Sequence, residues 1–355
     1  MPLIEDWRIP SRHAFVLTEG RKLVKIPDEV RECVCFLLYD SRKHQREVIA
    51  GTAFIASEPI PDTHSSFRWV VTAAHVLNGV LADSADGIVR LRLNSRSGGF
   101  VTIASDASSW DQHPTYDVAA TVGIATDEVD ADARYFPLDD RNIASDAMIV
   151  DEAIGVGDDL FFPGLFKHHP GTERNVPIVR TGAIAAMPGE PLRLSYWGRM
   201  SAYLVETRSI GGLSGSPVFA YLGLVRVTNE GNLQVVKGKH GRFLLLGVMS
   251  GHYKGEMGVS DAVNADADTD AEEREVNMGI GIVVPVQRLM EVVKRPELDD
   301  IKAKKRQELL DEEAGNTVAD SAGSVASEGP VLATREDFES ALRKVSRRKP
   351  SPPDA

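Results

Sequence analysis

Short apolar runs separated by turn residues dominate the chain from about residue 30 to residue 285. Most of these runs are too short for helices, several alternate apolar with polar residues, and β-branched and aromatic residues are frequent in them. This pattern predicts an all-β domain, either a sandwich or a barrel. The clearest runs are CVCFLLY, GTAFIA, RWVVTAA, DVAATVGI, SPVFAYLGLV and FLLLGVMS.

One amphipathic helix is predicted after the last apolar run. Val286, Leu289, Met290 and Val293 have the spacing of a single helical face, and Pro296 ends the pattern. Such a face packs a helix onto the body of a domain. The residues that follow are charged and then small and polar, so they bury too little apolar surface to fold alone. We expect a docked helix followed by a linker.

A second short helix is predicted near the end of the chain, at about residues 335–346. Thr334 and Asp337 form a capping pair, and an apolar stripe begins at Phe338. This helix is either a solvated end or an element that docks on the body or on a partner, so the tail is a candidate regulatory contact. The resulting division is an N-terminal extension (1–28), a β domain (29–295) and a charged, partly disordered tail (296–355).

Length and charge restrict the class of protein. A chain of 355 residues can bury a large core, and its 43% hydrophobic and 26% charged residues are typical of a globular protein. The formal net charge is -12. Nucleic acid is therefore not expected as a partner, because its binding depends on clustered lysine and arginine.

The two cysteines, Cys33 and Cys35, are predicted to be free thiols of the core. They stand on one face of the run CVCFLLY and are poorly placed to bridge in an extended chain. The first residues include acidic side chains and a proline where a secretory signal needs an apolar stretch. With no run of about 18 apolar residues either, we expect a reducing, cytoplasmic location and no membrane insertion.

The segment SIGGLSGSPVF, residues 209–219, has more backbone freedom than a plain turn requires, since three glycines surround Ser214. A serine hydroxyl is a weak nucleophile, and it needs a base and amide donors for the developing oxyanion. With so little side-chain bulk, the chain can bend until the amides of Gly212 and Ser214 converge beside the Ser214 hydroxyl. The segment therefore indicates a nucleophilic serine.

His75 and Asp117 are the candidate partners of Ser214. His75 follows the apolar run RWVVTAA, and Asp117 heads the run DVAATVGI. An ionised carboxylate in apolar surroundings is costly unless it is paired, so Asp117 requires a partner that His75 could supply. Taken singly, His75 could be a satisfied core histidine and Asp117 a turn residue in water. The three residues together favour catalysis.

The motifs TAAHV, YDVAA and GGLSGSPVF, in this order, resemble the three signatures of trypsin-like (chymotrypsin-fold) serine peptidases. The closest likeness is to bacterial members, the glutamyl endopeptidases and the HtrA group. It extends from about Glu32 to Val293. The resemblance implies two six-stranded antiparallel β-barrels, at about 29–138 and 139–295, with the site in the cleft between them.

The resemblance also implies a role for each residue. His75 would be general base and then acid, Asp117 would fix its tautomer, and Ser214 would attack the carbonyl. The amides of Gly212 and Ser214 would form the oxyanion hole. Ser250, in LLGVMSG, matches the strand that lines the substrate cleft. No metal or organic cofactor is implied.

Substrate preference is implied less directly. Arg208 and Ser209 stand where the family builds its specificity pocket, and Gly251 and His252 continue the cleft strand towards the pocket entrance. Met249 replaces the histidine that the glutamyl endopeptidases place before this strand. The hypothesis is that Arg208 or His252 favours a small or acidic residue before the scissile bond. The alternative is an Arg208 side chain that points to solvent.

One acidic segment could be mistaken for a calcium loop. Asp266, Asp268 and Asp270 stand two residues apart, but Ala271 replaces the required glycine and Asn277 the bidentate acid. The pattern excludes an EF-hand and indicates an acidic surface loop.

The sequence thus predicts a serine endopeptidase that cleaves proteins or peptides through an acyl-enzyme. The alternative is a protease-fold binding or scaffold module whose site is silent or blocked by the tail. A weaker alternative is an esterase of small acyl substrates.

Overall fold

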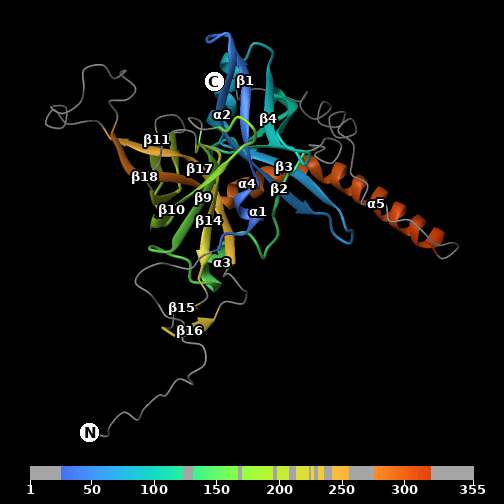
Figure 1. Ribbon diagram of the computed structural model, residues 1–355. Coiled ribbons are helices and arrows are strands. Elements are labelled where there is room, and N and C mark those ends of the chain that lie inside the picture. Colours follow the sequence, from blue (N-terminus) through green and yellow to red (C-terminus); the bar gives the residue numbers. More distant parts are fainter. Residues whose placement is uncertain are drawn as a thin grey trace, which may run out of the picture.

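The computed structural model shows two β units joined through a common core (Figure 1). The structure describes residues 25–122, 131–166, 170–194, 198–207, 213–223, 225–227, 231–235, 242–255 and 276–320. The helix predicted at about 335–346 and the acidic segment around residue 268 lie outside these residues.

The first half of the chain forms an eight-stranded sheet, ordered β5-β4-β1-β2-β3-β7-β6, to which β8 adds parallel to β2. Helix α2 packs on this sheet, and β3 leads directly into it. The elements are α1 (Asp28–Arg31), β1 (Val34–Ser41), β2 (Arg46–Pro59), β3 (Ser66–Thr72), α2 (Ala74–Asp83), β4 (Ile88–Asn94), β5 (Phe100–Asp106), η1 (Ala107–Ser109), β6 (Asp111–Gln112), β7 (Ala119–Val122) and β8 (Phe136–Pro137).

The second half forms a closed barrel, ordered β10-β13-β18-β17-β14-β9, and two small hairpins, β11-β12 and β15-β16. The elements are α3 (Asp146–Asp151), β9 (Asp159–Leu165), β10 (Pro177–Ala186), β11 (Leu192–Leu194), β12 (Gly198–Met200), β13 (Tyr203–Thr207), β14 (Pro217–Leu222), β15 (Val225–Val227), β16 (Leu233–Val235), β17 (Arg242–Gly255), β18 (Val276–Pro285), α4 (Val286–Val293), η4 (Pro296–Leu298) and α5 (Asp299–Asp320).

The structure confirms the predicted all-β class and the closed six-stranded barrel of the second half. The first half differs from the expected six-stranded barrel, because seven of its eight strands run from β5 to β6 without closing among the residues that the structure describes, and β8 pairs with β2 beside this path. The short strands β6 and β8 add to the sheet through two residue pairs each. Such brief pairings have no periodicity that a sequence pattern could show.

One hydrophobic cluster spans both halves. Phe36, Phe54 and Trp69 of the sheet share it with Phe219 of the barrel and Leu289 of α4. All five side chains are buried. The two β units therefore pack as one body, with α4 between them (Figure 1).

Helix α4 confirms the prediction made from its apolar stripe. It spans Val286–Val293, and Val286, Leu289, Met290 and Val293 are all buried. The expected linker after α4 is wrong for its first part, because the chain forms helix α5 there. This helix extends away from the body in Figure 1.

Helix α5 is fastened to the first sheet mainly by charged side chains. The Lys302 ammonium donates to both Glu58 carboxylate oxygens at 2.7 Å and lies 5.4 Å from the Trp69 ring centre. Leu309, 4% exposed, adds a buried apolar contact. A lysine stem can cover apolar surface while its charged end is paired, so apolar periodicity alone misses such a helix.

Both cysteines are free and buried, as predicted. They do not share a face, because β1 begins at Val34 and leaves Cys33 outside it; Cys33 and Cys35 pack in different hydrophobic clusters. Burial raises the pKa of both thiols, that of Cys35 to about 12.

We expect neither cysteine to react with iodoacetamide in the folded protein at mildly alkaline pH, because only the thiolate is nucleophilic. Both should react once guanidinium unfolds the chain. Mass spectrometry of native and unfolded samples measures this difference. Rapid alkylation of the native protein would contradict the buried placement.

Candidate active site

Three segments far apart in the sequence meet at the predicted site. His75 lies in the first turn of α2, three residues after the end of β3. Asp117 lies between β6 and β7, and Ser214 lies in the turn before β14. The first two lie in the half of the chain that forms the sheet and the third in the half that forms the barrel, so the site depends on how the two units pack.

The Asp117 carboxylate holds His75 at two points. Its Oδ1 accepts the His75 main-chain N–H at 2.8 Å, and its Oδ2 lies 2.7 Å from His75 Nδ1. Asp117 is 1% exposed and the His75 side chain 38% exposed. A carboxylate accepts and an imidazole nitrogen can donate, so this contact places the ring proton on Nδ1. Nε2 is then the proton acceptor.

Ser250, on β17, provides a third donor to the buried carboxylate. Its hydroxyl donates to Asp117 Oδ2 at 2.5 Å. The sequence placed Ser250 on the cleft strand but gave no sign of this contact, which joins residues 133 positions apart. Three donors from the chain compensate the loss of water around Asp117.

Ser250 also contacts Ser214. The half-buried Ser214 hydroxyl donates to the Ser250 main-chain oxygen at 3.2 Å. Although both side chains belong to the described residues, no hydrogen bond joins Ser214 Oγ to the His75 ring. Catalytic hydrogen bonds are often long or absent before substrate binds. The structure thus brings His75, Asp117, Ser214 and Ser250 together through one chain of contacts.

Gly215 determines the shape of the turn behind Ser214. Its φ is +85°, and a Cβ there would stand 2.1 Å from the Thr52 main-chain oxygen. The Thr52 amide donates to Ser214 O at 3.1 Å, and the Gly215 amide donates to Met249 O at 2.8 Å. The turn is therefore fixed from both β units, and a glycine is required after Ser214.

Several predicted site residues lie outside the part of the chain that the structure describes. They are Gly212, of the predicted oxyanion hole, and Arg208 and Ser209, of the predicted pocket. Gly251 and His252 lie on β17, half-buried, and pair with Ile282 and Gly281 of β18.

Strand β17 extends beyond β14, its neighbour on the side of Ser214. Its pairing with β14 ends at Val248 and Pro217, whereas its pairing with β18 continues to Gly255. Within the described ranges, the stretch that begins at Ser250 therefore has a strand on one side only. An extended peptide could add to the other side through main-chain hydrogen bonds.

Neither a metal site nor a membrane span is found in the described part of the chain. No group of three histidine, cysteine or carboxylate side chains there could hold a metal ion. None of the helices described is long and apolar enough to cross a membrane.

Comparisons with known proteins give solved structures only. No protein-family model and no curated protein matches the chain. One similar structure is the HtrA-type protease AlgW with a decapeptide, at 13% identity and a TM-score of 0.41. The similarity covers 76% of this chain and 66% of the AlgW chain, so this chain spans just under two thirds of that protein.

Two further structures are proteases as well. The MamO protease domain from Magnetospirillum magneticum has 13% identity and a TM-score of 0.39, covering 74% of this chain and 96% of that one. The inactive form of the Rv3671c protease has 15% identity and a TM-score of 0.38, covering 74% of this chain and 88% of that one. At this level of similarity, what the chain does must be inferred from its own side chains.

Proposed function

We propose that the chain is a serine endopeptidase that cleaves proteins or peptides through an acyl-enzyme. The observation that carries this proposal is the orientation of the partly exposed His75 ring by the buried Asp117 carboxylate, which leaves Nε2 as a proton acceptor. A buried aspartate with this pair of contacts fixes a histidine in the tautomer that a general base needs.

In the proposed reaction, the Ser214 hydroxyl leaves the Ser250 oxygen and turns to His75. Nε2 takes the hydroxyl proton while Oγ attacks the substrate carbonyl, and the resulting imidazolium is stabilised by Asp117. His75 then gives the proton to the leaving amine, which departs from the acyl-enzyme. A water, deprotonated by the same nitrogen, attacks the ester carbonyl; the ester bond then breaks, Nε2 returns the proton to Ser214 Oγ, and the acid product leaves.

Two main-chain features support a peptide substrate. The tight turn at Gly215 fixes the main chain next to Ser214, whose amide is one of the two donors of the proposed oxyanion hole; the other, Gly212, lies outside the described residues. In the part of the chain that the structure describes, strand β14 stops pairing with β17 at Val248, so an extended peptide can align with β17 next to the Ser214 hydroxyl. The preference for a small or acidic residue and the cytoplasmic location stay predictions.

A silent binding module is the second candidate. The observation that favours it is the Ser214 hydroxyl itself, which donates to Ser250 O and not to His75. A site held permanently in this state would have no activated nucleophile.

A fluorophosphonate probe tests the proposal, because it reacts with activated serines only. We expect the purified full chain to be labelled once, at Ser214, and Ser214→Ala to remain unlabelled. Sequencing of new N-termini in a protein mixture, with wild type against Ser214→Ala, then measures peptide-bond cleavage. A folded but unlabelled wild type would establish the silent module. Labelling and hydrolysis of nitrophenyl esters without any cut protein would establish an esterase.

A further inference from the structure

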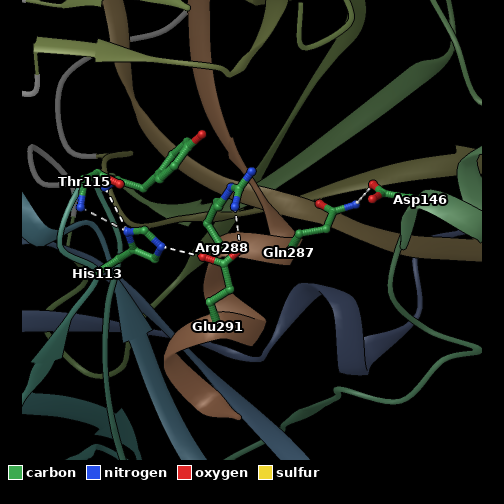
Figure 2. Close-up of polar contacts among 7 residues, drawn as sticks. His113, Thr115, Asp146, Gln287, Arg288 and Glu291 are labelled. Atoms are coloured by element: carbon green, nitrogen blue, oxygen red, sulfur yellow. Dashed lines mark hydrogen bonds and ion pairs between the residues drawn. The ribbon is translucent and has the colours of Figure 1, made fainter. Parts of the chain in front are cut away.

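The segment that carries Asp117 is held in place by helix α4, through a histidine that the sequence did not single out. His113, 7% exposed, stands four residues before Asp117. Its Nε2 lies 2.7 Å from Glu291 Oε2 on α4, a contact between residues 178 positions apart (Figure 2).

The ring of His113 makes hydrogen bonds with both nitrogens. Nδ1 accepts the main-chain N–H groups of Thr115 and Tyr116, each at 3.1 Å. A nitrogen that accepts two amides carries no proton, so the ring is neutral and Nε2–H donates to Glu291. The ring thus links the turn just before Asp117 to the C-terminal helix.

Main-chain contacts close this turn on both sides of Asp117. The His113 amide donates to Val118 O at 3.0 Å, and the Val118 amide donates to Tyr116 O at 2.8 Å. The His113 and Tyr116 rings meet edge to face, with centres 5.0 Å apart. Any shift of the His113 ring would therefore move the main chain on either side of the Asp117 carboxylate.

Glu291 is itself fixed by a neighbour on α4. Arg288 pairs with Glu291 Oε1, and its guanidinium carbon lies 4.6 Å from the Tyr116 ring centre. Burial alone would raise the pKa of the Glu291 carboxyl, but the hydrogen bond from His113 and the charge of Arg288 lower it overall. Glu291 therefore stays an ionised acceptor for the His113 N–H.

We propose that His113 and Glu291 are positioning residues for Asp117. They transmit the docking of α4 to the turn at residues 113–118, and they keep the Asp117 carboxylate in reach of both His75 donors. The consequence for catalysis rests on the proposed function, whereas the consequence for the position of Asp117 does not. Neither residue contacts the reacting atoms.

The experiment measures two things separately: whether the Asp117 carboxylate is in place, and how fast Ser214 reacts. The His75 amide donates to Asp117 Oδ1, so its hydrogen exchange, followed by NMR, reports whether the carboxylate is in place. The rate of fluorophosphonate labelling at Ser214 reports the reactivity. The Leu91 amide, in the core of the first sheet, serves as the reference for global stability.

Four variants separate the two halves of the contact. His113→Ala removes both the acceptor of the turn amides and the donor to Glu291. His113→Asn keeps an acceptor for the turn amides but loses the hydrogen bond to Glu291. Glu291→Ala removes only the contact from α4, and Glu291→Gln keeps an oxygen that can accept from Nε2–H. Gln287→Ala is the matched control, since Gln287 joins the same helix to Asp146, away from the turn, at 2.7 Å (Figure 2).

We expect His113→Ala to speed exchange of the His75 amide about tenfold relative to Leu91, and to slow labelling about 10²-fold, as a small misplacement of a catalytic group does. His113→Asn and Glu291→Ala should have intermediate effects, and Glu291→Gln and Gln287→Ala should match wild type. Faster exchange would support the positioning role even if wild type is not labelled.

The proposal would be overturned if the His75 amide in His113→Ala exchanged at the wild-type rate. It would also be overturned if Gln287→Ala sped this exchange as much as His113→Ala does. If His113→Ala does not fold, His113→Asn and Glu291→Ala decide in the same way. Wild-type exchange in both of these variants would also overturn it.

Discussion

Asp117→Asn protein is expected to lose about 10⁴-fold in kcat, because the amide cannot accept from all three donors that meet the carboxylate. An asparagine side chain has one acceptor oxygen and one NH2 group. With the NH2 group towards His75 Nδ1, that nitrogen must accept, and the ring proton moves to Nε2. Nε2 can then no longer take the Ser214 proton.

The opposite rotamer does not rescue the variant. It turns the NH2 group towards the His75 main-chain N–H, so that two donors face each other in a buried site. An unsatisfied buried donor costs about 1–3 kcal/mol, so this rotamer is disfavoured by that amount. We therefore expect the inactive tautomer to dominate, with some loss of stability in addition.

The measurement is kcat on a peptide that wild type cleaves, together with the urea midpoint of both proteins. Ser250→Ala is the matched control, because it removes one donor to Asp117 without changing the His75 tautomer. Its kcat should fall far less than that of Asp117→Asn. A kcat of Asp117→Asn within tenfold of wild type would contradict the assigned role of Asp117.

Gly215→Ala is expected to destabilise the fold by about 4 kcal/mol or more, a loss that only a few mechanisms produce. Two of them act here. The backbone has φ +85°, which an alanine rarely adopts, and the added Cβ would stand 2.1 Å from Thr52 O and 2.3 Å from Thr72 Oγ1. Since Thr52 belongs to β2, the clash cannot be relieved without separating the turn from the first sheet.

Urea denaturation of wild type and Gly215→Ala measures this loss, and labelling of Ser214 by the fluorophosphonate should be lost with it. Gly79→Ala is the control, because Gly79 lies inside α2 and a Cβ there meets nothing within 4 Å. That substitution should stabilise the protein by roughly 0.5–1 kcal/mol. A Gly215→Ala protein as stable as wild type would refute the strained turn.

Features that depend on neighbouring residues could be predicted from the sequence. Helix α4 was predicted because its apolar side chains repeat with the helical period and Pro296 follows. The all-β class and the burial of both cysteines rest on equally local patterns. The glycine after Ser214 marked an unusual turn, and the structure gives it φ +85°.

Features that join distant segments could not be predicted in this way. Nothing near Ser250 indicates that its hydroxyl meets Asp117, and nothing near His113 indicates Glu291. Helix α5 was missed because charged contacts such as the ion pair of Lys302 with Glu58, and not an apolar stripe, fasten it to the first sheet. These contacts depend on the relative position of two β units.

The sequence by itself determined the β class, helix α4 and the burial of both cysteines, and it predicted which serine, histidine and aspartate to examine, because each of these features is expressed in residues adjacent along the chain. Only the tertiary structure decided that Ser250 and His75 share the Asp117 carboxylate and that α4 reaches the turn before it. The physical reason is that these hydrogen bonds form only after a common core, shared by both halves, has packed the units together.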